Sequence, residues 1–382
     1  MRNIPYGRHF IDRSDIKAVT AVLKSDWITQ GPKIREFEGA LCERTGAKYA
    51  VAVSSGTAAL HLACLASGIT SGDEVITSPI TFVASANCIL YCGGRPVFAD
   101  VQKDTLNINP DEIKRHISKK TKALICIHFA GHPVDLKEIH SIAQKHNLIV
   151  IEDAAHALGA VYKNSKIGSC KYSDIAIFSF HPVKAVTTGE GGAILTNRKD
   201  LYEKLLMLRS HGITKDVSRF TCRDSKMTGP WYYEQQYLGF NYRITDIQCS
   251  LGLSQLKKLD GFLEKRRKLV DTYNEALCDI NAIILPKEKP YVKSAWHLYY
   301  IRLRSASKRK ALFEQLLKSG IGAQVHYIPV HLQPYYRKNF SYKPGDFPQA
   351  EHYYESTITL PLYPQMTKSD IQYVIKVLKG HL

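Results

Sequence analysis

The chain has 382 residues, more than the roughly 250 to 300 at which a single hydrophobic core stops growing, so we expect two domains. Hydrophobic residues make up 45% and charged residues 23%, a balance that excludes a largely disordered protein. The formal net charge is +17, but the basic clusters are short and flanked by helix-like sequence, without zinc-finger or RNA-binding signatures. Solvated helix faces are therefore favoured over a nucleic-acid patch, and the charge is compatible with an anionic small substrate.

Helix-like and strand-like segments alternate from about Asp15 to Asp153. The expected helices span residues 15–25, 33–46, 56–68, 81–93, 111–118 and 136–147. The expected strands span residues 49–55, 73–79, 96–101, 122–131 and 148–154. Strands that alternate with helices favour an α/β fold with a mainly parallel sheet covered on both faces.

The pattern changes in the second half of the chain. Residues 220–237 are polar and aromatic without periodicity, which predicts a long loop. One long helical pattern follows from Thr245 to Leu277, and Thr245 and Gln248 form a capping box at its start. The later segments predict strands at 297–303 and 322–328 and helices at 307–320 and 369–379. We expect a large domain with an N-terminal arm over residues 1–255 and a small domain over 256–382.

Lys184 lies in the stretch FSFHPVKAVTTGEGG, a few residues beyond a segment that predicts a buried strand, residues 175–180. Pro182 prevents a helix from starting at once, so Lys184 is expected on a turn at the strand's end, where a ligand can reach it. When Lys184 is taken alone, a surface lysine that merely ends a strand is the favoured explanation.

Asp153 closes the apolar strand LIVIED. Carboxyl ends of parallel strands face the crevice in which such sheets bind ligands, so Asp153 is a candidate partner for a pyridinium nitrogen. Its alternative role is the N-cap of the segment that follows.

The segment from Ser54 to Thr57 joins an expected strand to an expected helix. Free amides at the first turn of a helix hold phosphate, and Gly56 lets the backbone approach closely. An ordinary capped helix is the alternative. A lysine, an acid and an anion site are together the three features that a pyridoxal phosphate enzyme requires.

Other signatures are missing from the sequence. GEGG does not follow a strand as a dinucleotide fingerprint must, and neither a P-loop nor a GxSxG elbow occurs. The histidine pairs lack metal-site spacing, so we expect no metal. The nine cysteines are odd in number and form no CxxC pair, and no apolar run of 18 residues or N-terminal apolar region occurs. These features predict a cytoplasmic protein with reduced thiols and no membrane partner.

The ordered motifs resemble the DegT/DnrJ/EryC1/StrS family of pyridoxal phosphate sugar aminotransferases over essentially the whole chain. They are WITQGP at 27–32, SSGTAAL at 54–60, TSPITFVASAN at 77–87, EDAAHALGA at 152–160, FSFHPVKAVTTGEGG at 178–192, RSHGI at 209–213 and GFNYRITDIQ at 239–248. Residues 229–248 and 322–336 most resemble the UDP-sugar 4-aminotransferases of the pseudaminic acid pathway. The resemblance implies fold type I of these transferases, which is the aspartate aminotransferase fold, in a homodimer with shared active sites.

The resemblance also implies roles for individual residues. Lys184 would be the Schiff-base lysine, and Asp153 would hold the pyridine nitrogen. The other implied cofactor contacts are Gly56, Thr57, Ala58, Phe82, His156 and Ser179, with Asn241 from the second subunit. Arg243, His326 and Tyr327 would face the nucleotide sugar.

The implied reaction moves the amino group of L-glutamate to carbon 4 of a UDP-linked 4-keto-6-deoxy-N-acetylhexosamine, with Lys184 as general base and acid. UDP-2-acetamido-2,6-dideoxy-β-L-arabino-hex-4-ulose is the expected keto sugar. Related dehydratases replace the lysine, usually by histidine, so Lys184 argues for transamination. The alternatives are another UDP- or dTDP-keto sugar and, from a different class, a non-catalytic regulatory protein with the same fold.

Overall fold

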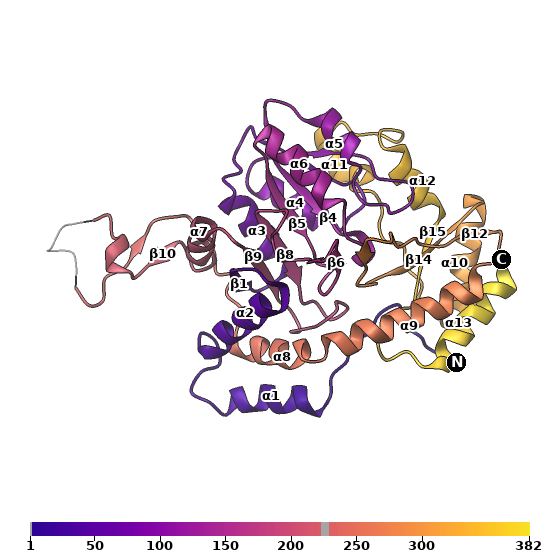
Figure 1. The fold of residues 1–382 in the computed structure, drawn as a ribbon, viewed down its shortest axis with the longest axis horizontal. Coiled ribbons are helices and arrows are strands. Elements are labelled where there is room, and N and C mark those ends of the chain that lie inside the picture. The colour runs from indigo at the N-terminus through magenta and orange to yellow at the C-terminus, as the bar shows by residue number, and fades with distance from the viewer. Residues whose placement is uncertain (1, 223–228) are drawn as a thin grey trace.

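A seven-stranded sheet forms the centre of the larger part of the molecule (Figure 1). The computed structural model describes residues 2–222 and 229–382. The strand order is β1-β9-β8-β5-β4-β2-β3, and β9 alone runs antiparallel to the other six. The strands are β1 (Tyr49–Val53), β2 (Glu74–Thr77), β3 (Arg95–Phe98), β4 (Thr121–Ile127), β5 (Ile149–Asp153), β8 (Ile175–Ser179) and β9 (Gly192–Thr196). The expected mainly parallel sheet of an α/β fold is therefore confirmed.

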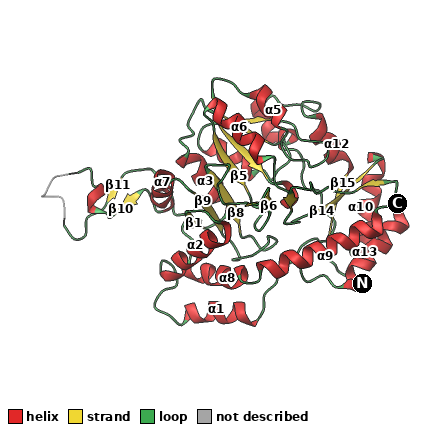
Figure 2. Cartoon of the chain, viewed as in Figure 1, coloured by secondary structure: helices red, strands yellow, loops and turns green. Residues whose placement is uncertain are grey.

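Helices cover both faces of this sheet, as Figures 1 and 2 show. On β5, Val150 faces one hydrophobic core and Ile151 faces the other, because successive side chains of a strand point to opposite sides. One face packs against α3 (Gly56–Ala66), α4 (Ala84–Tyr91) and α7 (Lys199–Arg209). The other packs against α2 (Pro32–Thr45), α5 (Pro110–His116), α6 (Leu136–His146) and α8 (Asp246–Leu256). Helix α1 (Arg13–Leu23) lies outside α8.

The C-terminal part contains a second, three-stranded sheet with a hydrophobic core of its own. Its strands β12 (Ile283–Ile284), β14 (Tyr299–Leu303) and β15 (Thr357–Leu360) pair antiparallel. Its main helices are α9 (Leu259–Leu277), α10 (Arg309–Lys318) and α13 (Lys368–His381). The start of the chain also packs here, because the Ile4 side chain joins this core and its N–H donates to the Gly320 carbonyl at 2.9 Å. The boundary between residues 255 and 256 stays a prediction.

Short elements complete the described part of the chain. They are α11 (Pro334–Phe340), α12 (Pro348–Ser356), β6 (Val161–Tyr162), β7 (Ser165–Lys166), β10 (Ile213–Thr214), β11 (Glu234–Gln235), β13 (Val292–Lys293) and the 3-10 helices η1 (Phe129–Gly131), η2 (Val217–Arg219), η3 (Ala306–Lys308) and η4 (Val330–Leu332). No helix among the described residues has the length and apolar character needed to cross a membrane.

Three sequence expectations differ from the structure. The single helix from Thr245 to Leu277 is two helices, because Lys258 donates its N–H to Gln255 three residues back rather than continuing the α-helical pattern. The capping box at Thr245 is present. Residues 322–328 form no strand, and they make one isolated bridge, between Gln324 and Thr359 of β15. Residues 223–228 of the expected loop lie outside the described residues, and the rest of it contains β11 paired with β10.

Candidate active site

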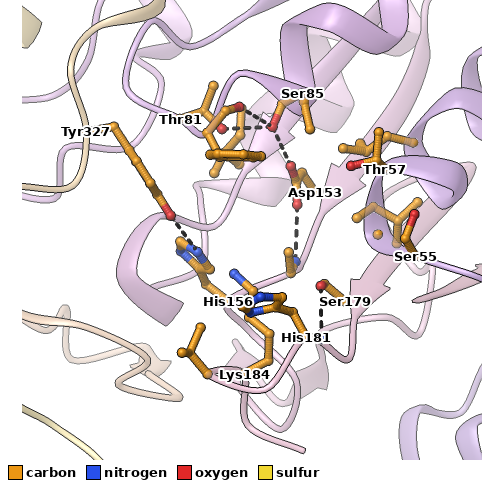
Figure 3. A pocket seen from close by; sticks show the side chains of 18 of the residues that line it. Ser55, Thr57, Thr81, Ser85, Asp153, His156, Ser179, His181, Lys184 and Tyr327 are labelled. Atoms are coloured by element: carbon orange, nitrogen blue, oxygen red, sulfur yellow. Dashed lines mark hydrogen bonds between the residues drawn. The ribbon is translucent and has the colours of Figure 1, made fainter. Parts of the chain in front are cut away.

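A cavity of about 460 Å³ lies where the carboxyl ends of β5 and β8 meet the start of α3. Its volume is typical of small-molecule sites, and its position is where open α/β sheets bind ligands. Segments that lie far apart in the sequence line it (Figure 3). The polar and aromatic lining residues are Tyr6, Ser55, Thr57, Thr81, Phe82, Ser85, Asp153, His156, Ser179, His181, Lys184, Glu190, His326 and Tyr327.

Lys184 reaches this cavity from the turn that follows β8. At the base of this turn, the Phe180 N–H donates to the Gly191 carbonyl at 2.9 Å. Within the turn, the Lys184 N–H donates to the His181 carbonyl at 2.9 Å. Desolvation lowers the pKa of Lys184 from 10.5 to about 8, although the attraction of Asp153 acts in the opposite direction. A lysine with this pKa is partly neutral near neutral pH and can act as a nucleophile and a base.

Asp153 ends β5 inside the cavity with 6% of its surface exposed. Its Oδ2 accepts a hydrogen bond of 2.6 Å from the Ser85 hydroxyl, and its Oδ1 accepts one of 3.1 Å from the Ala155 N–H. The Ser85 hydroxyl also lies 2.8 Å from Thr81 Oγ1. The sequence offered helix N-capping as the alternative role of Asp153. Asp153 does accept the N–H of a following residue, but no helix begins there, so it is not an N-cap.

The start of α3 forms an anion cradle opposite these groups. Ser55 caps the helix by accepting the Ala58 N–H at 3.0 Å, and Thr57 is exposed to the cavity. A Cβ atom on Gly56 would lie 2.9 Å from Ser179 Cβ, so only glycine lets this turn approach the end of β8. The hydroxyls of Thr57 and Ser179 and the first-turn amides of α3 suit a phosphate group.

Aromatic side chains close the other side of the cavity. Phe82 is 60% exposed there, and its ring centroid lies 6.3 Å from that of Tyr327. The Tyr327 hydroxyl is 3.2 Å from His156 Nε2, and the His156 and His297 rings lie 4.3 Å apart. Burial lowers the pKa of His156 well below its usual value, and the charge of Lys184 adds to this effect. Desolvation likewise lowers the pKa of His326 to about 4, so both imidazoles are neutral at physiological pH.

These residues fit pyridoxal phosphate. The cofactor has an aldehyde, a ring nitrogen, a ring hydroxyl and a phosphate, and the cavity offers an amine, a carboxylate, an imidazole and a helix start. Among the described residues, the buried Nδ1 atom of His156 has no hydrogen-bond partner. Such an orphan atom in a cavity wall is expected where a bound molecule supplies the missing partner.

The structure brings together nine of the twelve predicted site residues and places three elsewhere. Ala58 lies behind the cavity wall, and its N–H is engaged by Ser55. Asn241 and Arg243 do not line the cavity of their own chain, and they form isolated backbone bridges with Ser210 and Val53.

Sequence reasoning missed Tyr6, Thr81, Ser85, His181 and Glu190 as lining residues. Thr81 and Ser85 lie inside the quoted motif TSPITFVASAN, and their offset of four residues was the available signal for a shared face. Tyr6 gave no such signal, because it reaches the cavity through packing against residues more than three hundred positions away.

Among the described residues, no group of three or more histidine, cysteine or carboxylate side chains is arranged to hold a metal ion.

Comparison with known families assigns nearly the whole chain to one family. The profile described as the DegT/DnrJ/EryC1/StrS aminotransferase family matches residues 9–379. The chain is 42% identical to the spore coat polysaccharide biosynthesis protein SpsC of Bacillus subtilis, over 98% of this chain and 96% of that protein. It is 40% identical to a UDP-4-amino-4,6-dideoxy-N-acetyl-beta-L-altrosamine transaminase of Campylobacter jejuni, over 97% of this chain and 95% of the relative.

Solved structures agree with this placement. PseC of Helicobacter pylori, an aminotransferase of pseudaminic acid biosynthesis, superposes with a TM-score of 0.91 at 34% identity over 100% of this chain and 99% of PseC. The PLP form of Spr1654 from Streptococcus pneumoniae gives 0.91 at 31% identity over 100% of both chains. The expected aspartate aminotransferase-like fold and dependence on pyridoxal phosphate are thereby confirmed.

Proposed function

The chain belongs to the DegT/DnrJ/EryC1/StrS aminotransferase family, and from this premise we propose that it aminates carbon 4 of a UDP-linked 4-keto-6-deoxy-N-acetylhexosamine with L-glutamate as donor. That it is a pyridoxal phosphate-dependent sugar aminotransferase follows from the family itself. The UDP sugar is the finer part of the proposal. It is supported by the Campylobacter relative, whose name is that of a UDP-sugar transaminase, and by the likeness to PseC.

The observation that carries the catalytic part is the convergence of Lys184, Asp153 and the start of α3 on one cavity. Pyridoxal phosphate, when bound, supplies the carbonyl that takes up the amino group and the ring that stabilises the adjacent negative charge. Lys184 attaches the cofactor, and its amine then accepts the proton from the α-carbon of the amino donor and passes it on. The pKa of about 8 suits this double role, because the amine gains and loses a proton readily near neutral pH.

Asp153 and His156 orient the cofactor. The Asp153 carboxylate holds a proton at the ring nitrogen, which the buried position makes a strong interaction. His156 offers its free Nδ1 to the ring hydroxyl, while Tyr327 holds the opposite nitrogen. Phe82 presents a ring for stacking, and Thr57 and Ser179 with the α3 amides hold the phosphate.

The sugar enters, in this proposal, from the side of His326 and Tyr327. Both are neutral, and neutral polar groups suit the hydroxyls and amide of an acetamido sugar. Arg243 is proposed to meet the nucleotide of a substrate bound to the second subunit, because it lies away from the cavity of its own chain.

The proposed homodimer completes the site. Asn241 would bond the phosphate in the cavity of the second copy, which is consistent with its exposed position outside its own cavity. The segment that carries β10 and β11 projects from the body of the molecule (Figure 1) and exposes Val217, Trp231 and Leu238 by 77%, 79% and 82%. Exposed apolar side chains of this size suit a protein partner, and here we propose the second copy.

The sugar is identified by a substrate panel. The protein, pyridoxal phosphate and glutamate are incubated with UDP- and dTDP-linked 4-keto sugars, and the 4-amino product is detected by mass spectrometry. We expect amination of the UDP-linked 4-keto-6-deoxy-N-acetylhexosamine and release of 2-oxoglutarate. Preference for a dTDP sugar would refute the subgroup assignment.

A further inference from the structure

Hydrogen bonds from two parts of the chain converge on the Asp153 carboxylate. Oδ1 accepts from the Ala155 N–H at 3.1 Å, and Oδ2 accepts from the Ser85 hydroxyl at 2.6 Å. Ser85 is 1% exposed and Asp153 is 6% exposed, so protein groups, rather than water, supply most of the hydrogen bonds to the carboxylate. A buried carboxylate without such donors is strongly disfavoured.

The direction of these hydrogen bonds is fixed by proton count. An ionised carboxylate only accepts, so the single proton of Ser85 goes to Asp153 Oδ2. The contact of 2.8 Å between Ser85 and Thr81 then requires Thr81 to be the donor. The competing acceptor for Ser85, the Phe82 carbonyl, is farther away at 3.4 Å. The hydrogen bonds therefore run from Thr81 to Ser85 and from Ser85 to Asp153, and the dashed lines of Figure 3 mark both contacts.

We propose that Ser85 and Thr81 are positioning residues, whose one-way hydrogen-bond chain keeps Asp153 charged and aimed at the ring nitrogen of the cofactor. Charge-assisted hydrogen bonds are stronger than neutral ones, and aligned hydroxyls polarise one another. Asp153 keeps lone pairs free on both oxygens, because each has accepted one hydrogen bond. The inference rests on the pyridoxal phosphate dependence and not on the identity of the sugar.

The other charged and titratable groups near Asp153 do not replace this chain. Lys184 attracts the carboxylate, but its amine is needed for the reaction. Burial raises the pKa of Tyr327 and the charge of Asp153 raises it further, so the phenol stays neutral. Among the described residues, Ser85 is the one side chain that donates to the Asp153 carboxylate.

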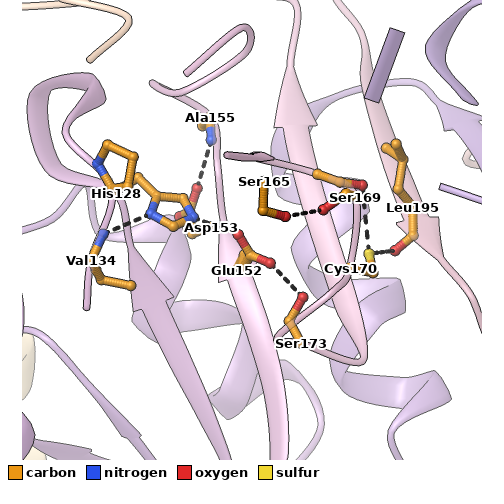
Figure 4. A network of polar contacts seen from close by, with 12 residues as sticks. His128, Val134, Glu152, Asp153, Ala155, Ser165, Ser169, Cys170, Ser173 and Leu195 are labelled. Atoms are coloured by element: carbon orange, nitrogen blue, oxygen red, sulfur yellow. Dashed lines mark hydrogen bonds and ion pairs between the residues drawn. The ribbon is translucent and has the colours of Figure 1, made fainter. Parts of the chain in front are cut away.

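The neighbouring carboxylate, Glu152, is engaged on the opposite side of β5 (Figure 4). Its Oε2 accepts from His128 Nε2 at 2.8 Å, and its Oε1 accepts from the Ser173 hydroxyl. The proton lies on His128 Nε2 because Nδ1 accepts the Val134 N–H at 3.1 Å. Glu152 therefore has its own hydrogen-bond donors and does not compete with Asp153 for the Ser85 hydroxyl.

The test compares cofactor binding in five variants of the full-length protein: S85A, T81V, T81S, the double variant S85A/T81V and the control T77V. T81V keeps the shape and removes the hydroxyl, whereas T81S keeps the hydroxyl. Thr77 is a buried threonine at the end of β2 whose hydroxyl bonds the Ile125 carbonyl at 3.0 Å, away from Asp153. Each apoprotein is titrated with pyridoxal phosphate, and its thermal midpoint without cofactor is recorded.

We expect S85A to weaken cofactor binding by about tenfold to a hundredfold, because a hydrogen bond to a charged group is lost. T81V should weaken binding by about threefold, and T81S and T77V should bind as the wild type does. T81V should add nothing in the S85A background, because Thr81 acts through Ser85. In S85A, Asp153 should stabilise the proton on the ring nitrogen of the cofactor less strongly. The ring nitrogen should therefore lose that proton at a lower pH than in the wild type, and the absorbance of the bound cofactor should report the shift.

Three results would overturn the inference. The first is that S85A and T81V bind the cofactor as tightly as T77V does. The second is that T81V reduces cofactor affinity by the same factor whether or not Ser85 is present. The third is a loss of cofactor affinity in S85A matched by a drop in the thermal midpoint of the apoprotein, which would mean that Ser85 only stabilises the fold. None of these measurements uses a sugar, so a wrong sugar assignment leaves them unaffected.

Discussion

The phenol of Tyr327 lies 3.2 Å from His156 Nε2, which joins the C-terminal part of the chain to the loop after β5. The two rings are nearly parallel, with centroids 6.2 Å apart. His156 is thereby held by Tyr327 on one nitrogen, while its other nitrogen is buried without a partner among the described residues. The orientation of the His156 ring, in the loop after β5, therefore depends on Tyr327 from the C-terminal part of the chain.

Tyr327→Phe should reduce kcat about threefold to tenfold, because the hydrogen bond that orients His156 is lost while the ring stays in place. Cofactor content, measured by absorbance, should remain close to that of the wild type. Tyr335→Phe is the matched control, since Tyr335 is 59% exposed and does not line the cavity. Equal activity of the two variants would show that Tyr327 does not orient His156.

Lys184→Ala should bind pyridoxal phosphate without covalent attachment. After borohydride reduction and denaturation, mass spectrometry should find the cofactor on the wild type and none on the variant. Lys204→Ala is the control, because the Lys204 ammonium bonds the Ala66 carbonyl at 3.2 Å outside the cavity. A cofactor adduct that persists in Lys184→Ala would assign the attachment to another lysine.

The rate at which added cofactor attaches to the apoprotein should depend on pH through Lys184. Burial disfavours the charged amine, which lowers its pKa to about 8, and only the neutral amine attacks a carbonyl. At pH 7 roughly one amine in ten is then neutral, against fewer than about one in a thousand for an ordinary lysine. The rate should rise with pH and level off above about 8. A rate that still climbs between pH 9 and 10 would contradict the lowered pKa.

Mixed dimers test whether the sites are shared. Lys184→Ala and Asn241→Ala should each be nearly inactive alone. If Asn241 serves the cavity of the second copy, a mixed dimer has one site with both residues intact. Mixing and refolding the two variants should therefore restore up to about a quarter of wild-type activity, measured as 2-oxoglutarate release. No restoration would mean that Asn241 acts within its own chain, or that the dimer is wrong.

The central sheet and the placement of Lys184 and Asp153 were predictable from the sequence, because Asp153 ends one apolar strand, Lys184 lies in the turn after another, and the ends of the two strands meet at one edge. Hydrophobic periodicity reports this kind of position well. It does not report which groups polar side chains bond, so the contact of Thr81 with Ser85 and the hydrogen bond of Ser85 to Asp153 were missed.

The helix interruption near Lys258 and the position of Tyr6 in the cavity were missed for a similar reason. Between Leu256 and Leu259, where the helix is interrupted, the sequence has no glycine or proline; instead, the Lys258 ammonium bonds Asp15 of α1 at 2.7 Å. The contribution of Tyr6 depends on packing of Ile4 against residues near Gly320. Contacts this distant in sequence leave no local pattern, so neither feature could be read from composition or periodicity.

Gly192→Ala should destabilise the fold by about 3 kcal/mol and reduce cofactor affinity, because an added Cβ has no room. It would lie 2.4 Å from the Ser55 carbonyl oxygen and 2.8 Å from the Gly56 nitrogen, and both are backbone atoms of the phosphate cradle. Gly39→Ala on the exposed side of α2 meets nothing within 4 Å and should stabilise the protein by about 0.5–1 kcal/mol. Denaturant unfolding and cofactor titration measure both effects. If both variants unfold and bind cofactor alike, the close approach of β9 to Ser55 is not needed to shape the cradle.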